Sequence, residues 1–342
     1  MAHFSSGSYG SNKGKIINWP FFIVFLIIVT VIVVLIWAYN PFGEKERKEG
    51  VDNSKKETEP PAVVSVEMSP KAKEIDKPKV EEPKVEEPNE QVAELIMDAV
   101  ACINAQPPRI IEARDRLNEL LSKSMSEKQR MLVKEQLSSL AAQWLFSPRL
   151  FPQDELCTNY TVNVGDQLRT IAMRFKVPYE ILMEINNIRR AELLQAGSTI
   201  KVIKGPFNAK VYLSAFKMDL YLQDTFVRSF EVGIGKPGRE TPTGLWVVEE
   251  GGKLIKPGWT DPDTGRRYEP DDPDYPLGSR WIELKGIEGD AVGRTGIAFH
   301  GTKDANGIGT AGSRGCIRLH NGDVITVYNL LVPVYSQVRV SN

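Results

Sequence analysis

Residues 300–319 have the sequence HGTKDANGIGTAGSRGCIRL, which brings a histidine and a cysteine close together in a glycine-rich segment. A free thiol is a weak nucleophile at neutral pH because its pKa is about 8.5, and a paired imidazole lowers that pKa. The small residues Gly312 and Gly315 would let backbone N–H groups approach such a site as an oxyanion hole. Spacing alone does not establish catalysis, because a buried structural cysteine beside an unrelated histidine explains this pattern better.

The segment around this stretch, residues 207–342, has the pattern of a mainly β domain. Short runs of alternating apolar and polar residues, such as 210–214 and 226–232, are separated by turn residues. Residues 251–278 form a long segment rich in Asp, Pro and Gly. A loop of this length in a compact domain is usually functional, so we expect a lid or a wall of a substrate site.

Several short motifs in this domain resemble a known family. They are His300-Gly-Thr, Ile308-Gly309, Ser313-x-Gly-Cys-Ile-Arg-Leu, Asn321-x-Asp323, Thr241-Pro-Thr-Gly244 and Pro276-Leu-Gly-Ser-Arg-Trp281. Together they resemble the signature of the YkuD-type L,D-transpeptidases over about residues 207–340. The resemblance implies a catalytic domain of β-sandwich character that acts on the peptide stems of peptidoglycan and requires no metal or cofactor.

The resemblance also implies roles for individual residues. Cys316 would be the nucleophile and His300 its general base, with the carbonyl of Gly301 orienting the imidazole and Gly315 completing the catalytic set. The implied substrate-binding residues are Arg318, Ser313, Arg314 and Thr302. Many relatives have His where this chain has Arg314, so an auxiliary role at that position does not carry over directly.

The implied reaction is an acyl transfer through a thioester. Cys316 would attack a tetrapeptide stem at its third residue, the terminal D-Ala would leave, and an acceptor amine would take the acyl group. The product would be a 3→3 cross-link or an attached protein. Two alternatives remain open: an L,D-carboxypeptidase or hydrolase of wall peptides, and a non-catalytic anchor between membrane and peptidoglycan.

Residues 158–204 have a strand–helix–helix–strand pattern and carry a second resemblance, to a LysM module, which is an α+β fold. The residues that carry it are Tyr160-Thr-Val-Asn-Val-Gly-Asp-Gln-Leu-Arg-Thr-Ile-Ala, Asn186 and Ala196-Gly-Ser-Thr-Ile-Lys-Val. The resemblance implies binding to peptidoglycan strands that contain N-acetylglucosamine, through Gly165, Asp166, Gln167, Asn186, Asn187 and Ile188. A LysM-like fold without affinity for glycan is the alternative. Asp166 is also placed to cap the helix that follows it.

Residues 90–150 predict a small α-helical module. Apolar residues recur at helical spacing along three stripes, which start at Val92, Ile110 and Leu132. Ser126 followed by Gln129 resembles a capping box at the start of the third helical stretch. A helical hairpin and a three-helix module both fit this pattern, and nothing in the segment suggests chemistry.

Three further segments precede this module. Residues 1–16 are rich in Gly and Ser and are expected to form a cytoplasmic tail. Residues 17–39 are almost all apolar with aromatic residues at both ends, which predicts one transmembrane helix; a cleaved signal peptide is the alternative. Residues 40–89 are rich in Pro, Glu and Lys and predict a disordered linker. We therefore expect a multidomain, single-pass protein of the cytoplasmic membrane. The basic residues on the two sides of the span are nearly balanced, so the expected orientation, with the N-terminus inside and the catalytic domain outside, rests on the function that the resemblances imply.

The composition limits the partners and the redox chemistry. The net charge of −1 gives no indication of nucleic-acid binding. The two resemblances imply the glycan and peptide stems of peptidoglycan as partners, and the apolar span predicts the inner membrane as a further one. Three cysteines are too few for a disulfide scaffold. Cys102 and Cys157 could pair in an oxidising compartment, or they could remain two separate buried thiols. The oligomeric state is left open by these observations.

Overall fold

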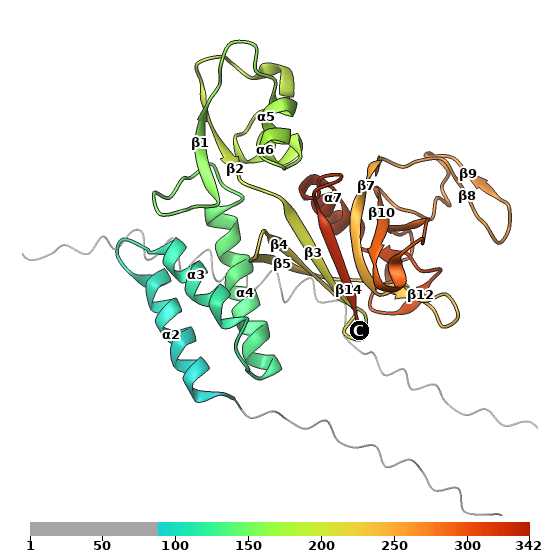
Figure 1. The fold of residues 1–342 in the computed structure, drawn as a ribbon, viewed down its shortest axis with the longest axis horizontal. Helices are drawn as coiled ribbons and strands as arrows, with labels where there is room; N and C mark the ends of the chain where they lie inside the picture. Colours follow the sequence, from blue (N-terminus) through green and yellow to red (C-terminus); the bar gives the residue numbers. More distant parts are fainter. Residues whose placement is uncertain (1–87) are drawn as a thin grey trace, which may run out of the picture. The chain divides into compact units, whose positions relative to one another are not determined.

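The computed structural model describes residues 88–342, in which helices come first, a small α+β unit follows and a β-rich part comes last (Figure 1). The expected cytoplasmic tail (1–16), transmembrane helix (17–39) and nearly all of the linker (40–89) lie outside these residues. Within residues 88–342, no helix combines the length and the apolar character that crossing a bilayer requires.

The first part is a module of three helices rather than a helical hairpin, which the sequence had also allowed. They are α2 (Glu90–Asn104), α3 (Ile110–Leu120) and α4 (Glu127–Trp144). Its core contains fully buried side chains from each helix, including Ala99, Leu117 and Leu137. The predicted capping box is confirmed, since the Ser126 hydroxyl accepts from the Gln129 backbone and the Gln129 side chain accepts from the Ser126 backbone.

The second part has the expected strand–helix–helix–strand order. Its elements are β1 (Cys157–Thr161), α5 (Leu168–Arg174), α6 (Tyr179–Ile185), the 3₁₀ turn η1 (Ala191–Leu193) and β2 (Thr199–Ile203). Lys201 of β2 is 3% exposed, and its ammonium group donates to the carbonyls of Trp144, Ser147 and Arg149. These bonds satisfy carbonyls at and just beyond the end of α4, where a helix leaves them without partners, so they tie this unit to the helical module.

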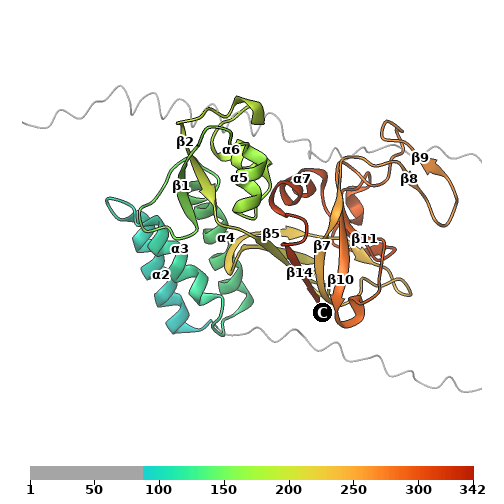
Figure 2. The ribbon, with the colours of Figure 1, turned by 45° about the horizontal axis from the view of Figure 1, so that its top comes forward.

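The third part contains an eight-stranded sheet with the order β13-β11-β10-β7-β14-β3-β4-β5. The strands are β3 (Phe207–Tyr212), β4 (Lys217–Leu222), β5 (Thr225–Glu231), β7 (Gly244–Leu254), β10 (Trp281–Glu288), β11 (Ile297–His300), β13 (Ile317–Arg318) and β14 (Gln337–Ser341). The expected mainly β character of this domain is confirmed, and its β-sandwich character stays a prediction. The long strands are joined in one sheet because β14 pairs in parallel with β3 and antiparallel with β7. The strand β14 thus connects the β3–β4–β5 meander to the half of the sheet that carries β11 and β13 (Figure 2).

Shorter elements surround this sheet. They are β6 (Ile234–Gly235), β8 (Trp259–Thr260), β9 (Arg267–Tyr268), η2 (Gly289–Ala291), η3 (Ala305–Gly307), β12 (Ala311–Ser313) and α7 (Asn321–Leu330). β6 pairs in parallel with β12, and β8 pairs antiparallel with β9. The long segment 251–278 is therefore more regular than its composition suggests, because it begins inside β7 and contains the β8–β9 hairpin.

The three cysteines are all free thiols in this structure. Cys102 and Cys157 are two separate buried thiols and form no disulfide with each other in this structure. Burial raises the pKa of the Cys157 thiol to about 12, which keeps it protonated at neutral pH. Cys316 is half-buried and is the most accessible of the three thiols.

Candidate active site

The pairing of β11 with β13 brings the predicted catalytic residues together. The two strands are parallel, with Phe299 opposite Ile317 and His300 opposite Arg318. Side chains alternate between the faces of a sheet, so Arg318 and His300 share one face while Phe299 and Ile317 are fully buried on the other. Cys316, one residue before β13, lines the same cavity of about 290 Å³ as His300 and Arg318. The fold therefore assembles residues that the sequence separates by up to 18 positions.

The imidazole of His300 is held in one orientation. Its side chain is 95% buried, its Nδ1 lies 2.5 Å from the carbonyl oxygen of Gly301, and its ring stacks on Trp281 with ring centres 5.7 Å apart. A carbonyl only accepts hydrogen bonds, so Nδ1 carries the proton and Nε2 presents its lone pair. Burial lowers the pKa of His300 to about 4, so the ring is neutral at pH 7.

The Cys316 thiol is also neutral at rest. Its Sγ lies 3.3 Å from the carbonyl oxygen of Gly296, to which it donates. Burial raises the pKa of this thiol, outweighing the backbone contact with Ala298 and the positive charge of Arg318, which both lower it. Burial thus favours a neutral thiol beside a neutral imidazole at rest, and it opposes the expected lowering of the thiol pKa by the imidazole.

The turn that carries Cys316 is built around Ser313. Its hydroxyl accepts from the backbone N–H of Gly315 at 3.1 Å and donates to the carbonyl of Cys316 at 2.6 Å. Ser313 is 1% exposed. Thr302 is similarly buried, at 7% exposure, and its hydroxyl exchanges hydrogen bonds with the backbone of Asp304. Both residues thus shape loops of the site, and the predicted substrate contacts of both stay predictions.

Arg318 is the residue of the predicted substrate-binding set whose charge is unpaired. It is half-buried and lines the cavity beside Cys316. Among residues 88–342, no carboxylate lies within salt-bridge distance of its guanidinium group. A fixed cation in this position is suited to a carboxylate of a bound ligand.

Arg314 is instead engaged by the β8–β9 hairpin. Its Nη2 donates to both oxygens of Asp261 at 3.0 and 3.1 Å, and its Nε donates to Asp263 at 2.7 Å. Arg239 adds a second ion pair to Asp263 at 3.0 Å. The hairpin also places Trp259 in the wall of the cavity. The segment 251–278 therefore forms a wall of the candidate site, as its length predicted. Asp261 and Asp263 are functional candidates in this segment that the sequence did not identify.

Asn321 is a further residue of the site that received no role from the sequence. Its Oδ1 accepts from the backbone N–H of Ser279 at 3.1 Å, and its Nδ2 donates to the carbonyl of Thr302 at 2.9 Å. A Cβ atom on Gly278 or on Gly301 would approach Oδ1 to 2.1 or 2.2 Å, so only glycine fits at both positions. Asn321 therefore holds the backbone at Thr302, next to Gly301, whose carbonyl orients His300. The only signal in the sequence was its place in the motif Asn321-x-Asp323.

The predicted glycan-binding residues lie in two loops of the α+β unit. The expectation that Asp166 caps the following helix is wrong, since α5 has no side-chain cap. The Asp166 carboxylate instead accepts from the hydroxyl of Tyr160 at 2.7 Å and from the backbone of Asn163 at 2.8 Å. Asn186 uses its amide inside the fold, accepting from Lys201 and donating to the carbonyls of Leu182 and Lys201. The remaining residues of the set are Gly165, Gln167 and Asn187, which are exposed, and Ile188, which is half-buried.

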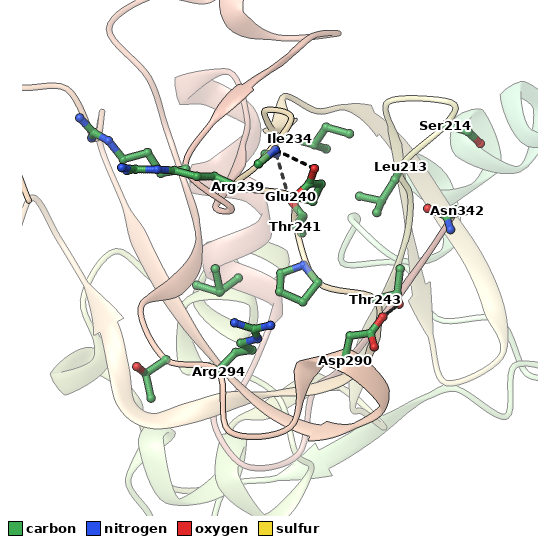
Figure 3. Close-up of a pocket in the computed structure, with 16 residues that line it drawn as sticks. Leu213, Ser214, Ile234, Arg239, Glu240, Thr241, Thr243, Asp290, Arg294 and Asn342 are labelled. Atoms are coloured by element: carbon green, nitrogen blue, oxygen red, sulfur yellow. Dashed lines mark hydrogen bonds between the residues drawn. The ribbon is translucent and has the colours of Figure 1, made fainter. Parts of the chain in front are cut away.

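A second cavity, of about 890 Å³, lies next to the first and shares Arg239 and Arg314 with it. Figure 3 shows Glu240, Thr241, Asp290 and Arg294 among the residues that line it. Arg239, which lies in the segment that connects β6 to β7, thus lines both cavities.

Comparison with known proteins matches two parts of the chain. The family described as the L,D-transpeptidase catalytic domain (YkuD) matches residues 208–340, and the LysM domain family matches residues 160–202. YkuD of Bacillus licheniformis is 28% identical over 189 residues, which cover 53% of this chain and 98% of that protein. ErfK/SrfK of Escherichia coli is 30% identical over 205 residues, covering 53% of this chain and 63% of that protein. Both relatives bear names that assign them provisionally to the L,D-transpeptidases.

A solved structure of an L,D-transpeptidase from Mycobacterium tuberculosis H37Rv is 18% identical, with 43% of this chain and 64% of that chain aligned and a TM-score of 0.32. A likeness of this size supports no conclusion by itself. The two family matches agree with the motifs and with the order of the elements. The chain therefore carries a catalytic domain of the YkuD family of L,D-transpeptidases, preceded by a LysM domain.

Proposed function

We propose that this chain is a peptidoglycan L,D-transpeptidase that uses Cys316 as its nucleophile and His300 as its general base. The observation that carries the proposal is the shared cavity, in which the thiol, a buried imidazole of fixed tautomer and the unpaired Arg318 face the same space. A nucleophile, a base and a cation for a carboxylate are what acyl transfer from a peptide requires.

The first half-reaction forms a thioester. The sulfur of Cys316 attacks the carbonyl carbon of the third residue of a tetrapeptide stem as Nε2 of His300 takes the thiol proton. The C–N bond to the terminal D-Ala then breaks, and the imidazolium returns the proton to the leaving amine. Because both groups are neutral at rest, this proton moves during the attack, which is general base catalysis rather than reaction of a preformed ion pair.

The second half-reaction transfers the acyl group to an acceptor. An amine, ideally from the side chain of a neighbouring stem, attacks the thioester and gives a proton to His300, which passes it to the departing sulfur. An amide bond replaces the C–S bond, and the product is a 3→3 cross-link or an attached protein. No step in this scheme needs a metal or a redox cofactor.

The other parts of the chain would bring this chemistry to its substrate. The LysM domain at residues 160–202 would bind glycan strands, which raises the local concentration of peptide stems at the catalytic domain. Residues 17–39 would anchor the chain in the cytoplasmic membrane, with residues 40–89 as a tether and the catalytic domain on the outer side. Protease protection of the full chain in membrane vesicles tests this orientation.

Incubation of the full chain with defined tetrapeptide fragments tests the proposed reaction. Release of D-Ala together with a cross-linked dimer supports the transferase, whereas tripeptide without dimer supports a hydrolase. No turnover combined with binding to purified sacculi supports a non-catalytic anchor. Cys316→Ala should abolish either activity and leave binding intact, and Cys102→Ala is the matched control because Cys102 is buried in the helical module.

A further inference from the structure

Thr241 joins two backbone groups beside the nucleophile. It lies between β6 and β7 and is 2% exposed. Its hydroxyl accepts from the N–H of Gly235 at 3.0 Å and donates to the carbonyl of Gly315 at 2.8 Å. In Figure 3, Thr241 lies beside Glu240 in the lining of the larger cavity. A buried hydroxyl with both bonds directed at backbone is thus in contact with the residue that precedes Cys316.

The backbone at Gly315 needs such support. Its φ of +112° is open only to glycine, and a Cβ atom there would approach Ile297 to 2.9 Å. Glycine has the widest conformational freedom of all residues, so its own preferences do not fix the peptide that follows it. The bond from Thr241 is the contact that holds the carbonyl of this peptide.

The direction of the Gly315 carbonyl sets the direction of the next N–H. The Gly315–Cys316 peptide is trans, so its carbonyl and its N–H point in opposite directions, and the Cys316 N–H points away from Thr241. Within residues 88–342 this N–H has no acceptor, whereas the neighbouring N–H of Gly315 is occupied by Ser313. A free backbone donor on the nucleophile's own residue is a recurring part of oxyanion holes.

We propose that the Thr241 hydroxyl is a positioning group for acyl transfer, which holds the Gly315–Cys316 peptide so that the Cys316 N–H is ready to stabilise the oxyanion. The inference rests on the proposed function, because it takes Cys316 as the nucleophile. Thr241 touches no reacting atom itself. Thr241 acts through the Gly315 carbonyl. The loop that carries Thr241 packs closely on Gly235, since a Cβ atom on Gly235 would approach the Arg239 carbonyl to 2.2 Å, and this packing keeps Thr241 in place.

Two reagents that modify the same sulfur by different chemistry test this role in the full chain. Iodoacetamide alkylates the thiolate by displacing iodide from a saturated carbon, so no oxyanion develops. p-Nitrophenyl acetate acylates the thiolate through a tetrahedral oxyanion and releases p-nitrophenolate. The ratio of the two rate constants, each corrected with Cys316→Ala, reports oxyanion stabilisation, because a change in the amount of thiolate affects both rate constants alike and cancels.

Thr241→Val has nearly the same shape without the hydroxyl and should lower the ratio of acylation to alkylation about 10-fold or more. This is less than the roughly 10²–10³-fold cost of removing an oxyanion donor itself. Thr241→Ser keeps the hydroxyl and should restore the ratio to near that of the wild type. An unchanged ratio in Thr241→Val, or an equal fall in Thr241→Ser, would overturn the proposal. Should Thr241→Val fail to fold, Thr241→Ala is judged by the same ratio.

The aryl ester contains no stem peptide, so this test separates the positioning role from the proposed substrate. A wild-type chain that releases no D-Ala from tetrapeptide, combined with a lower ratio in Thr241→Val, would refute the substrate and support the role of Thr241. Full tetrapeptide turnover by the wild type with an unchanged ratio in Thr241→Val would support the proposed substrate and refute the role of Thr241.

Discussion

Replacement of His300 should remove a large part of the pH dependence of stability. The imidazole is 95% buried, and burial lowers its pKa from an ordinary value of 6.5 to about 4. Below pH 6.5 the unfolded chain binds this proton while the folded chain does not, so stability is lost as the pH falls from about 6.5 to about 4. The difference between the two pKa values corresponds to about 3 kcal/mol. His300→Gln cannot bind the proton, so it should lack this loss.

Denaturant titration of the full chain, followed by tryptophan fluorescence at pH 7.5 and at pH 4, measures the effect. The free energy of unfolding should fall between these pH values by about 3 kcal/mol more in the wild type than in His300→Gln. Any packing cost of the substitution is present at both pH values and cancels in this comparison. His320→Gln is the matched control because His320 is exposed, and it should behave like the wild type. Equal pH dependence in the wild type and His300→Gln would refute the reasoning that burial keeps this imidazole neutral.

Three further outcomes follow from individual contacts. Alkylation of Cys316 by iodoacetamide should keep accelerating above pH 9, since burial raises the pKa of its thiol; a plateau below pH 7 would instead reveal a thiolate–imidazolium pair at rest. Asp263→Asn weakens the ion pairs of the β8–β9 hairpin with Arg314, so limited proteolysis within the hairpin should become faster, and an unchanged rate would show that these pairs do not hold it. Asn186→Ala leaves backbone groups of the buried Lys201 without partners and should destabilise the LysM domain by about 2 kcal/mol in thermal unfolding; an unaltered transition would contradict the structural role of this amide.

Local chemistry made much of this molecule predictable from its sequence. The helical module, the LysM order and the capping box at Ser126 depend on periodicity and on contacts three or four residues apart, which a single sequence displays. Cys316 and His300 were identified because the motif around them is specific. Their meeting in one cavity follows from the parallel pairing of β11 with β13.

Long-range contacts were the part that the sequence concealed. No local pattern indicates that β14 joins both halves of the sheet by pairing with β3 and with β7. The Arg314 contact to Asp261 spans 53 positions, so a residue expected near the substrate is held by the hairpin. The burial that raises the pKa of the Cys316 thiol was also hidden, because a spacing of residues carries no information about burial.

Mass spectrometry of the intact full chain after brief exposure to tetrapeptide stems tests the central claim most directly. The account predicts one covalent acyl adduct of a tripeptide stem, formed with loss of D-Ala, that peptide mapping places on Cys316 and that is absent from Cys316→Ala. The absence of any adduct while D-Ala is released, or an adduct located on Cys102 or Cys157, would contradict the claim that Cys316 is the nucleophile.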